Sequence, residues 1–245
     1  MTREEKVLQL KQDFDEVYEA GKQAECDAFW DNLFDSVEWG SYNYFFAGTY
    51  WNDTTFKPNR DIVAGAGYTC LEMFRNNRVT NIAETLEKQG VVLDVSGAGG
   101  WTNMFNAAST IRLPLLDFSS VKNYQLQLNS VFSGCTQLET IDKLIVTKEL
   151  SYSNAFYNCN NLVNLLIEGV IGKSGLNLQW STKLSKASIE SIINHLDLTE
   201  GRPTTSITLS LTAVNNAFEG GADGDEFNDL CASARAFGNW TISLV

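Results

Sequence analysis

Ser130-Val-Phe-Ser-Gly-Cys-Thr-Gln-Leu-Glu-Thr-Ile141 has a second copy in the chain, Asn154-Ala-Phe-Tyr-Asn-Cys-Asn-Asn-Leu-Val-Asn-Leu165. In both stretches a Phe is followed by Cys three residues later, by Leu six residues later and by Ile or Leu nine residues later. Phe74 and Phe105 begin two looser copies, and the spacing between the four Phe residues falls from 31 to 27 to 24. Such a period is typical of a solenoid, in which each unit covers an apolar face that it cannot bury alone.

We therefore predict an α+β solenoid of short irregular leucine-rich repeats with stacked β-strands. Asn residues beside the Phe positions, such as Asn103 and Asn154, suit tight turns because they tolerate left-handed backbone geometry. The predicted repeat core consists of Phe74, Phe105, Phe132, Cys135, Leu138, Phe156, Cys159 and Leu162.

The pattern A-F-x-x-C-x-x-L-x-x-[IL] in these copies resembles the BspA-type, or treponemal-type, leucine-rich repeat of bacterial surface proteins over residues 68–171. That resemblance implies adhesion or protein binding and no shared catalytic residues. Across nearly its whole length the chain also resembles minor structural proteins encoded in the tail regions of phages and prophages of gut bacteria. The segments that carry the second resemblance are 28–31, 51–58, 179–193, 212–218 and 239–245.

Four parts are expected along the chain: an assembly helix (1–38), an aromatic N-terminal cap (39–67), the solenoid (68–171) and a mixed helix/strand C-terminal cap (172–245). The first part holds eleven acidic and four basic residues, a net charge of −7 out of −12 for the chain. Val7, Leu10, Phe14 and Val17 have the alternating spacing of a coiled-coil seam and are the predicted oligomerisation residues. The alternative is an amphipathic helix packed on its own domain.

The aromatic cap contains a candidate ligand platform made of Tyr42, Tyr44, Tyr50 and Trp51. Exposed rings of this kind stack on sugars. The favoured alternative is that they cover the apolar end of the solenoid, which would otherwise face water.

The C-terminal cap alternates helix and strand signals. Ser185 is a predicted N-cap for a helix that reaches Leu196, because its hydroxyl can accept from the first turn. A strand follows at 206–211, helices are expected at 212–218 and 226–237 with Asp225 as an N-cap, and a strand ends the chain at 240–245. This part is expected to close the sheet edge of the last coil.

No catalytic, cofactor-binding or metal site is predicted. The glycine cluster at 97–100 has Thr102 where a dinucleotide loop needs its third Gly. His195, the single histidine, is expected near a helix end, and the five cysteines are odd in number and without CxxC spacing. Acid pairs at Glu139 and Asp142 and at Asp223 and Asp225 leave a carbohydrate-active hydrolase open, since such enzymes need two carboxyls.

The charge and the hydropathy of the chain argue against two classes of partner. An acidic chain disfavours nucleic acid, which requires clustered Lys and Arg, and no apolar run is long enough for membrane insertion. The amino terminus lacks a signal-peptide pattern. We expect a non-enzymatic virion structural protein of a phage tail fibre or peripheral tail, assembled in the bacterial cytoplasm. Its expected partners are virion proteins or a host cell-surface receptor, which could be a protein or a glycan. The protein is expected to be a homo-oligomer, and a trimer is the predicted state. The first alternative is a bacterial surface adhesin of the BspA-type family.

Overall fold

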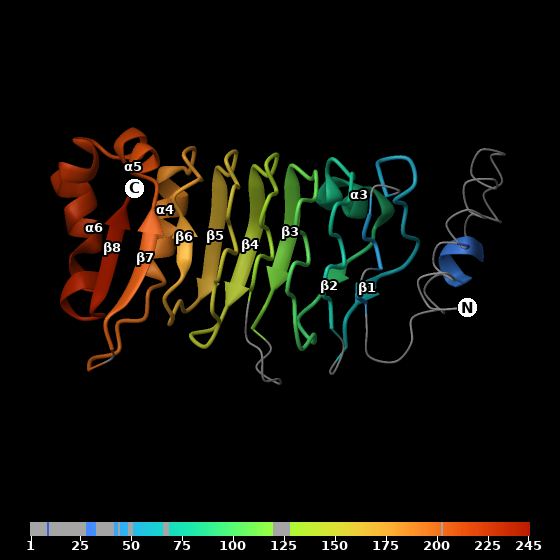
Figure 1. Ribbon diagram of the computed structural model, residues 1–245, viewed down its shortest axis with the longest axis horizontal. Coiled ribbons are helices and arrows are strands. Elements are labelled where there is room, and N and C mark those ends of the chain that lie inside the picture. The colour runs from blue at the N-terminus through green and yellow to red at the C-terminus, as the bar shows by residue number, and fades with distance from the viewer. Residues whose placement is uncertain are drawn as a thin grey trace.

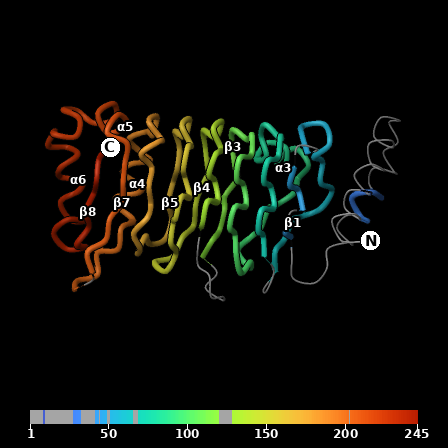
Figure 2. The backbone as a smooth tube through the Cα atoms, in the orientation of Figure 1, coloured from blue at the N-terminus to red at the C-terminus, as the bar shows by residue number. Residues whose placement is uncertain are grey.

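The computed structural model describes residues 9, 28–32, 42–43, 45–48, 51–65, 69–119, 128–201 and 203–245. Its strands are β1 (Ile62–Val63), β2 (Leu93–Asp94), β3 (Arg112–Asp117), β4 (Thr140–Val146), β5 (Asn164–Gly169), β6 (Leu176–Leu178), β7 (Thr205–Leu209) and β8 (Trp240–Leu244). Its helices are α3 (Ile82–Gln89), α4 (Lys186–Asn194), α5 (Leu211–Ala217), the 3-10 turn η1 (Gly221–Asp223) and α6 (Asp225–Ala236). These elements follow one another in chain order along the longest axis (Figures 1 and 2).

The strands form three separate sheets with the orders β1-β2, β3-β4-β5 and β6-β7-β8, and every pair is parallel. The predicted α+β solenoid of stacked leucine-rich repeats is therefore wrong as a fold class. The chain is an α/β protein with three short parallel sheets, in which the described helices lie in the connections between β1 and β2 and between β6 and β8.

Helix α4 explains why the second sheet stops at β5. The hydroxyl of Ser188 accepts a hydrogen bond from the backbone N–H of Leu165 at 2.9 Å, and the hydroxyl of Ser191 accepts from the N–H of Ile167 at 2.8 Å. A sheet edge presents unpaired backbone groups that need partners. Here helical side chains supply those partners, so no further strand joins β5.

Helix α3 lies at the opposite edge of the same sheet and packs against β3. Its first residue, Ile82, donates its backbone N–H to the hydroxyl of Thr110 at 3.1 Å, just before β3 begins. The side chain of Asn81 caps α3 by accepting from the N–H of Glu84. A helix at each edge therefore limits this sheet to three strands.

A row of stacked aromatic rings runs through the core. The ring centroids of Phe74 and Phe105 lie 5.1 Å apart, those of Phe105 and Phe132 5.8 Å, and those of Phe132 and Phe156 5.1 Å. All four rings are buried. Phe46 adds a fifth ring, stacked 5.1 Å from Phe74, which the sequence analysis did not include.

The segments that carry these rings are joined by backbone hydrogen bonds. The N–H of Phe74 donates to Met104, and that of Phe132 donates to Ala155. Two residues before and two residues after each Phe the backbone has a positive φ, a conformation that Asn and Gly adopt at low cost. The residues at these positions are Glu72, Asn76, Asn103, Ala107, Ser130, Gly134, Asn154 and Asn158. The predicted turn-forming role of Asn is confirmed at four of them.

The C-terminal elements match the sequence signals closely. Ser185 is the N-cap of α4, as predicted, and accepts from the N–H of Ser188. Helix α5 begins one residue earlier than expected, because the hydroxyl of Ser210 caps it. Asp225 is not an N-cap, since Gly224 holds that position and Asp225 is the first helical residue. The expectation that this part closes the edge of the preceding sheet is confirmed by α4, whose Ser188 and Ser191 hydroxyls accept from β5, while β6, β7 and β8 form a sheet of their own.

The predicted oligomerisation residues Val7, Leu10, Phe14 and Val17 lie outside the described residues. Residues 28–32 are helical, and Phe29 and Trp30 within them are buried. The ring of Trp30 lies 5.4 Å from that of Trp51. One hydrophobic cluster thus runs from Phe29 and Trp30 to Trp240 in β8. The division of the chain into four parts stays a prediction.

Candidate functional site

The buried cysteines are part of the packing. The thiol of Cys135 donates to the carbonyl of Phe105 at 2.9 Å, and that of Cys159 donates to the carbonyl of Phe132 at 3.1 Å. Burial raises the pKa of the Cys159 thiol to about 12, which disfavours the reactive thiolate. The amide of Asn77 makes the equivalent bond to the carbonyl of Phe46. In each case the residue three positions after a Phe of the row, Phe132, Phe156 or Phe74, ties its segment to the preceding one. The predicted core residues Leu138 and Leu162 are buried as well.

The predicted aromatic platform does not form a surface where the structure describes it. Tyr42 is 7% exposed and Trp51 is 0% exposed. Tyr42 packs edge-on against Phe45, and Trp51 packs edge-on against Phe46. The platform assignment is therefore wrong for these two rings, which belong to the core. Tyr44 and Tyr50 lie outside the described residues.

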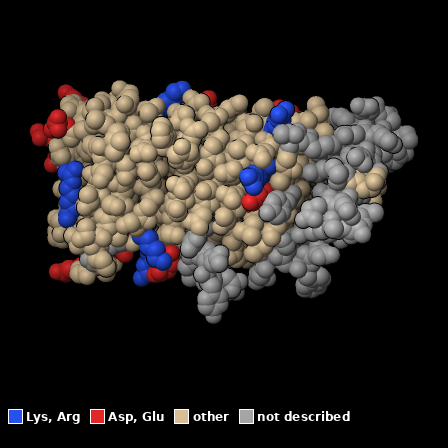
Figure 3. Space-filling view, in the orientation of Figure 1, with Lys and Arg blue, Asp and Glu red and all other residues tan. Residues whose placement is uncertain are grey.

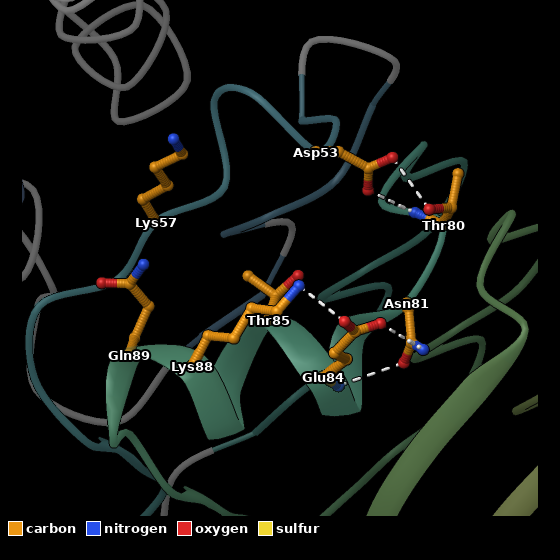
Figure 4. Close-up of a pocket in the computed structure, with 8 residues that line it drawn as sticks. All are labelled: Asp53, Lys57, Thr80, Asn81, Glu84, Thr85, Lys88 and Gln89. Atoms are coloured by element: carbon orange, nitrogen blue, oxygen red, sulfur yellow. Dashed lines mark hydrogen bonds and ion pairs between the residues drawn. The ribbon is translucent and has the colours of Figure 1, made fainter.

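A polar pocket of about 420 Å³ lies beside α3 (Figure 4). On one side of it Asp53 accepts from the N–H and the hydroxyl of Thr80 at 2.7 and 2.8 Å. Lys57 and Gln89 line the opposite side, as Figure 4 shows. The pocket joins the loop at residues 51–60 to the start of α3.

The charged groups of this pocket largely compensate one another. Glu84 lies between Lys88, whose Nζ is 2.5 Å from its carboxylate, and the amide of Asn81 at 3.1 Å. The hydrogen bond from Lys88 lowers the pKa of Glu84. A carboxylate held ionised in this way is a poor proton donor near neutral pH. The geometry fits a structural role for Glu84 in the first turns of α3.

Two other residues considered for chemistry, His195 and Asp142, have hydrogen-bond partners in the structure. His195 is the C-cap of α4, near a helix end as predicted, and its Nδ1 is 2.7 Å from the carbonyl of Ser191. Asp142 accepts two hydrogen bonds from Arg112, at 2.7 and 2.8 Å, and this pair raises the pKa of Arg112. Across the described ranges no group of three or more His, Cys, Asp or Glu side chains has the arrangement of a metal site.

The second sheet carries several charged side chains on its surface. Arg112 on β3 pairs with Asp142 on β4, and also with Glu87 of α3 at 2.9 Å. Lys143 on β4 pairs with Glu168 on β5 at 2.9 Å. This sheet therefore presents ion pairs to solvent, beside the exposed side chains of Leu115 and Leu166.

The outward side chains of the third sheet are uncharged. In β6 and β7 the positions between buried aliphatic residues are filled by amides and hydroxyls, and β8 continues the same alternation. These residues are Asn177, Ser206, Thr208, Thr241 and Ser243. Figure 3 shows one face of the molecule on which Lys, Arg, Asp and Glu lie at the margins and near the grey segments, while a broad area between them is uncharged. Such a surface favours a neutral partner.

An exposed aromatic pair lies where the Phe row meets β6. Tyr157 is 51% exposed and Trp180 is 41% exposed, and their rings are 5.7 Å apart at an interplanar angle of 73°. Tyr157 directly follows the buried Phe156, so it points away from the core. Neither residue was predicted from the sequence. The available signal was Tyr157 directly after the anchor Phe156, and Trp180 two residues after the end of β6.

The chain matches no protein-family model, no curated protein and no solved structure. None of the helices that the structure describes is long and apolar enough to cross a membrane.

Proposed function

We propose that this protein is a non-enzymatic binding component of a phage virion, located in the tail fibre or at a peripheral tail position. The observation that carries the binding role is the uncharged, partly aromatic face beside β6, β7 and β8. A binding surface gains affinity when its groups are already ordered. Buried stacked rings and a ladder of backbone hydrogen bonds hold this face in place.

The virion assignment rests on the resemblance of segments 28–31, 51–58, 179–193, 212–218 and 239–245 to minor tail proteins. In this proposal the protein is assembled in the bacterial cytoplasm and presents its uncharged face to a host receptor or to a neighbouring virion subunit. Mass spectrometry of phage particles purified on a density gradient tests it. Peptides of this chain at a constant ratio to the tail proteins support the proposal, and their absence from infectious particles contradicts it.

The adhesin alternative predicts a different location. A surface adhesin of a bacterium would be recovered from the outer face of cells that release no phage particles. Protease shaving of intact cells, followed by peptide identification, separates the two cases. Recovery from the cell surface and not from particles would favour the adhesin.

We further propose that copies associate through residues 1–38, by way of Val7, Leu10, Phe14 and Val17. Apolar residues at heptad spacing associate because pairing buries their seam. The full-length chain with Leu10→Asp and Phe14→Asp should then show a lower mass by light scattering than the unchanged chain. A change at Glu4→Gln and Glu5→Gln, off the seam, is the control. Equal masses for the unchanged and seam variants would remove the proposed interface.

A further inference from the structure

We infer that the aromatic pair Tyr157 and Trp180, together with the polar row beside it, is a binding site for an uncharged oligosaccharide. The inference rests on the proposed binding function and names the chemistry of the receptor. Its first element is the pair itself, two half-exposed rings in edge contact on the surface. Large aromatic rings left in water by a folded chain mark interaction sites more often than isolated aliphatic residues do.

The pair continues into an exposed apolar stripe, which we define as Tyr157, Trp180, Leu211 and Val245. The register Leu178↔Leu209 carries Trp180 and Leu211 to the same end of β6 and β7. The N–H of Leu211 donates to the carbonyl of Val245 at 2.8 Å, so these two residues are neighbours. All four side chains are exposed. The stripe runs across the strands, along the long axis of the molecule.

A polar row runs parallel to the stripe. Asn177, Thr208 and Ser243 are register partners on β6, β7 and β8, and all three are half-buried. Asn177 and Thr208 each precede a stripe residue by three positions. The row therefore lies at the ends of the strands that lead to the stripe. Ser206 and Thr241, which are exposed register partners, extend the polar surface beyond the row.

This combination suits a neutral sugar chain better than other ligands. A pyranose ring has an apolar face of C–H groups, which packs on an aromatic ring, and a rim of hydroxyls that both donate and accept hydrogen bonds. Amide and hydroxyl side chains also donate and accept. None of the residues of the stripe or the row is charged. The amine of Lys183, on the loop beyond Trp180, is already bonded to Asn161 at 2.7 Å. An acidic glycan would therefore find no cationic partner in the row.

The test uses the full-length protein on a glycan microarray that carries neutral hexose and N-acetylhexosamine oligomers beside uronate and sialylated ones. We expect binding to at least one neutral class, followed up by calorimetry with the corresponding hexasaccharide. Trp180→Ala and Tyr157→Ala should each weaken that binding about tenfold, which corresponds to about 1.4 kcal/mol. Phe237→Ala is the matched control, because Phe237 is 65% exposed outside the stripe and its loss should leave the affinity unchanged. Thermal melts check that all three variants are folded.

Three outcomes would overturn the inference. The first is no binding to any neutral glycan, and the second is unchanged affinity in Trp180→Ala. The third is a change in mass or in partner capture, and not in glycan binding, when Trp180 is replaced, since that would make the stripe a protein interface. Presence in purified virions without glycan binding would remove this inference alone. Glycan binding by a protein that is absent from virions would remove the virion assignment alone.

Discussion

The sheets β3-β4-β5 and β6-β7-β8 have the same number of parallel strands, but their outward surfaces differ in charge. The first carries paired charges, such as Lys143 with Glu168, while the second carries hydroxyls and amides. The first has a helix against each outer strand, and α4 supplies side-chain hydrogen bonds to β5. The comparison shows that backbone hydrogen bonds between parallel strands make both sheets rigid, while the outward side chains set which partners each surface can accept.

The largest expected effect comes from the aromatic row that supports both regions. Phe132 is fully buried and stacks on Phe105 and Phe156. Phe132→Ala should lower the free energy of unfolding by about 3–5 kcal/mol, because it removes buried apolar surface and leaves a cavity. Urea denaturation followed by circular dichroism measures the change. Phe237→Ala, at an exposed ring, should change stability by less than about 0.5 kcal/mol. Similar losses in the two variants would show that the row is not the main support.

The next effect tests how the sheet β3-β4-β5 ends at β5. Ser188→Ala removes the acceptor of the Leu165 N–H and the donor to the Val163 carbonyl. A buried N–H left without a partner costs about 1–3 kcal/mol, so we expect a loss of about 2 kcal/mol. Hydrogen exchange at Leu165 should quicken more than exchange within β7. Ser206→Ala, at an exposed position of β7, is the control. Unchanged protection of Leu165 would mean that α4 does not close this edge.

A gain in stability is expected at Tyr152, which lies before the last ring of the row. Its hydroxyl is buried and has no hydrogen-bond partner among the residues that the structure describes. Burial raises the pKa of Tyr152, as expected for a group removed from water. Tyr152→Phe should raise the free energy of unfolding by about 1 kcal/mol, because it removes an unsatisfied polar group. Tyr157→Phe, whose ring is exposed, should leave stability unchanged. A loss of stability in Tyr152→Phe would indicate that the hydroxyl is satisfied.

The smallest expected effect concerns the ion pair between Arg112 and Asp142 on the sheet β3-β4-β5. Asp142→Asn weakens the partly exposed pair with Arg112 and should cost about 0.5 kcal/mol, less at high salt because ions screen the pair. Denaturation at low and at high salt measures this difference. Glu200→Gln, an exposed acid before β7, is the control and should show no such salt dependence. An effect of Asp142→Asn that does not depend on salt would remove the electrostatic explanation.

Much of the core was predictable from the chain because its signals are local. The Phe and Cys positions recur at fixed offsets, and Asn residues occupy four of the positive-φ positions beside them. The N-cap of α4 at Ser185, the position of His195 near the end of that helix and the strand β8 were also predicted from the sequence. Phe46 was missed because its segment lacks the Cys and Leu that mark the two clear copies. Asp225 was misplaced because Gly224 takes the cap position.

The candidate site was less predictable. Tyr42 and Trp51 have the composition of a surface platform, yet tertiary packing buries them against Phe45 and Phe46. Tyr157 and Trp180 are 23 positions apart in the sequence and meet only after the chain has folded. Sequence composition counts aromatic residues, but it does not tell which of them remain in contact with water.

The amino-acid sequence by itself determined that the recurring Phe and Cys positions are buried and that the backbone turns beside them, since apolar spacing and left-handed positions act within a few residues. The tertiary structure alone decided that the strands separate into three sheets and that one of them presents an uncharged surface. The physical reason is that a strand edge is satisfied by whatever group reaches it. At β5 that group is Ser188, 23 residues beyond Leu165. No local sequence pattern predicts that a helix, and not a strand, will lie against this edge.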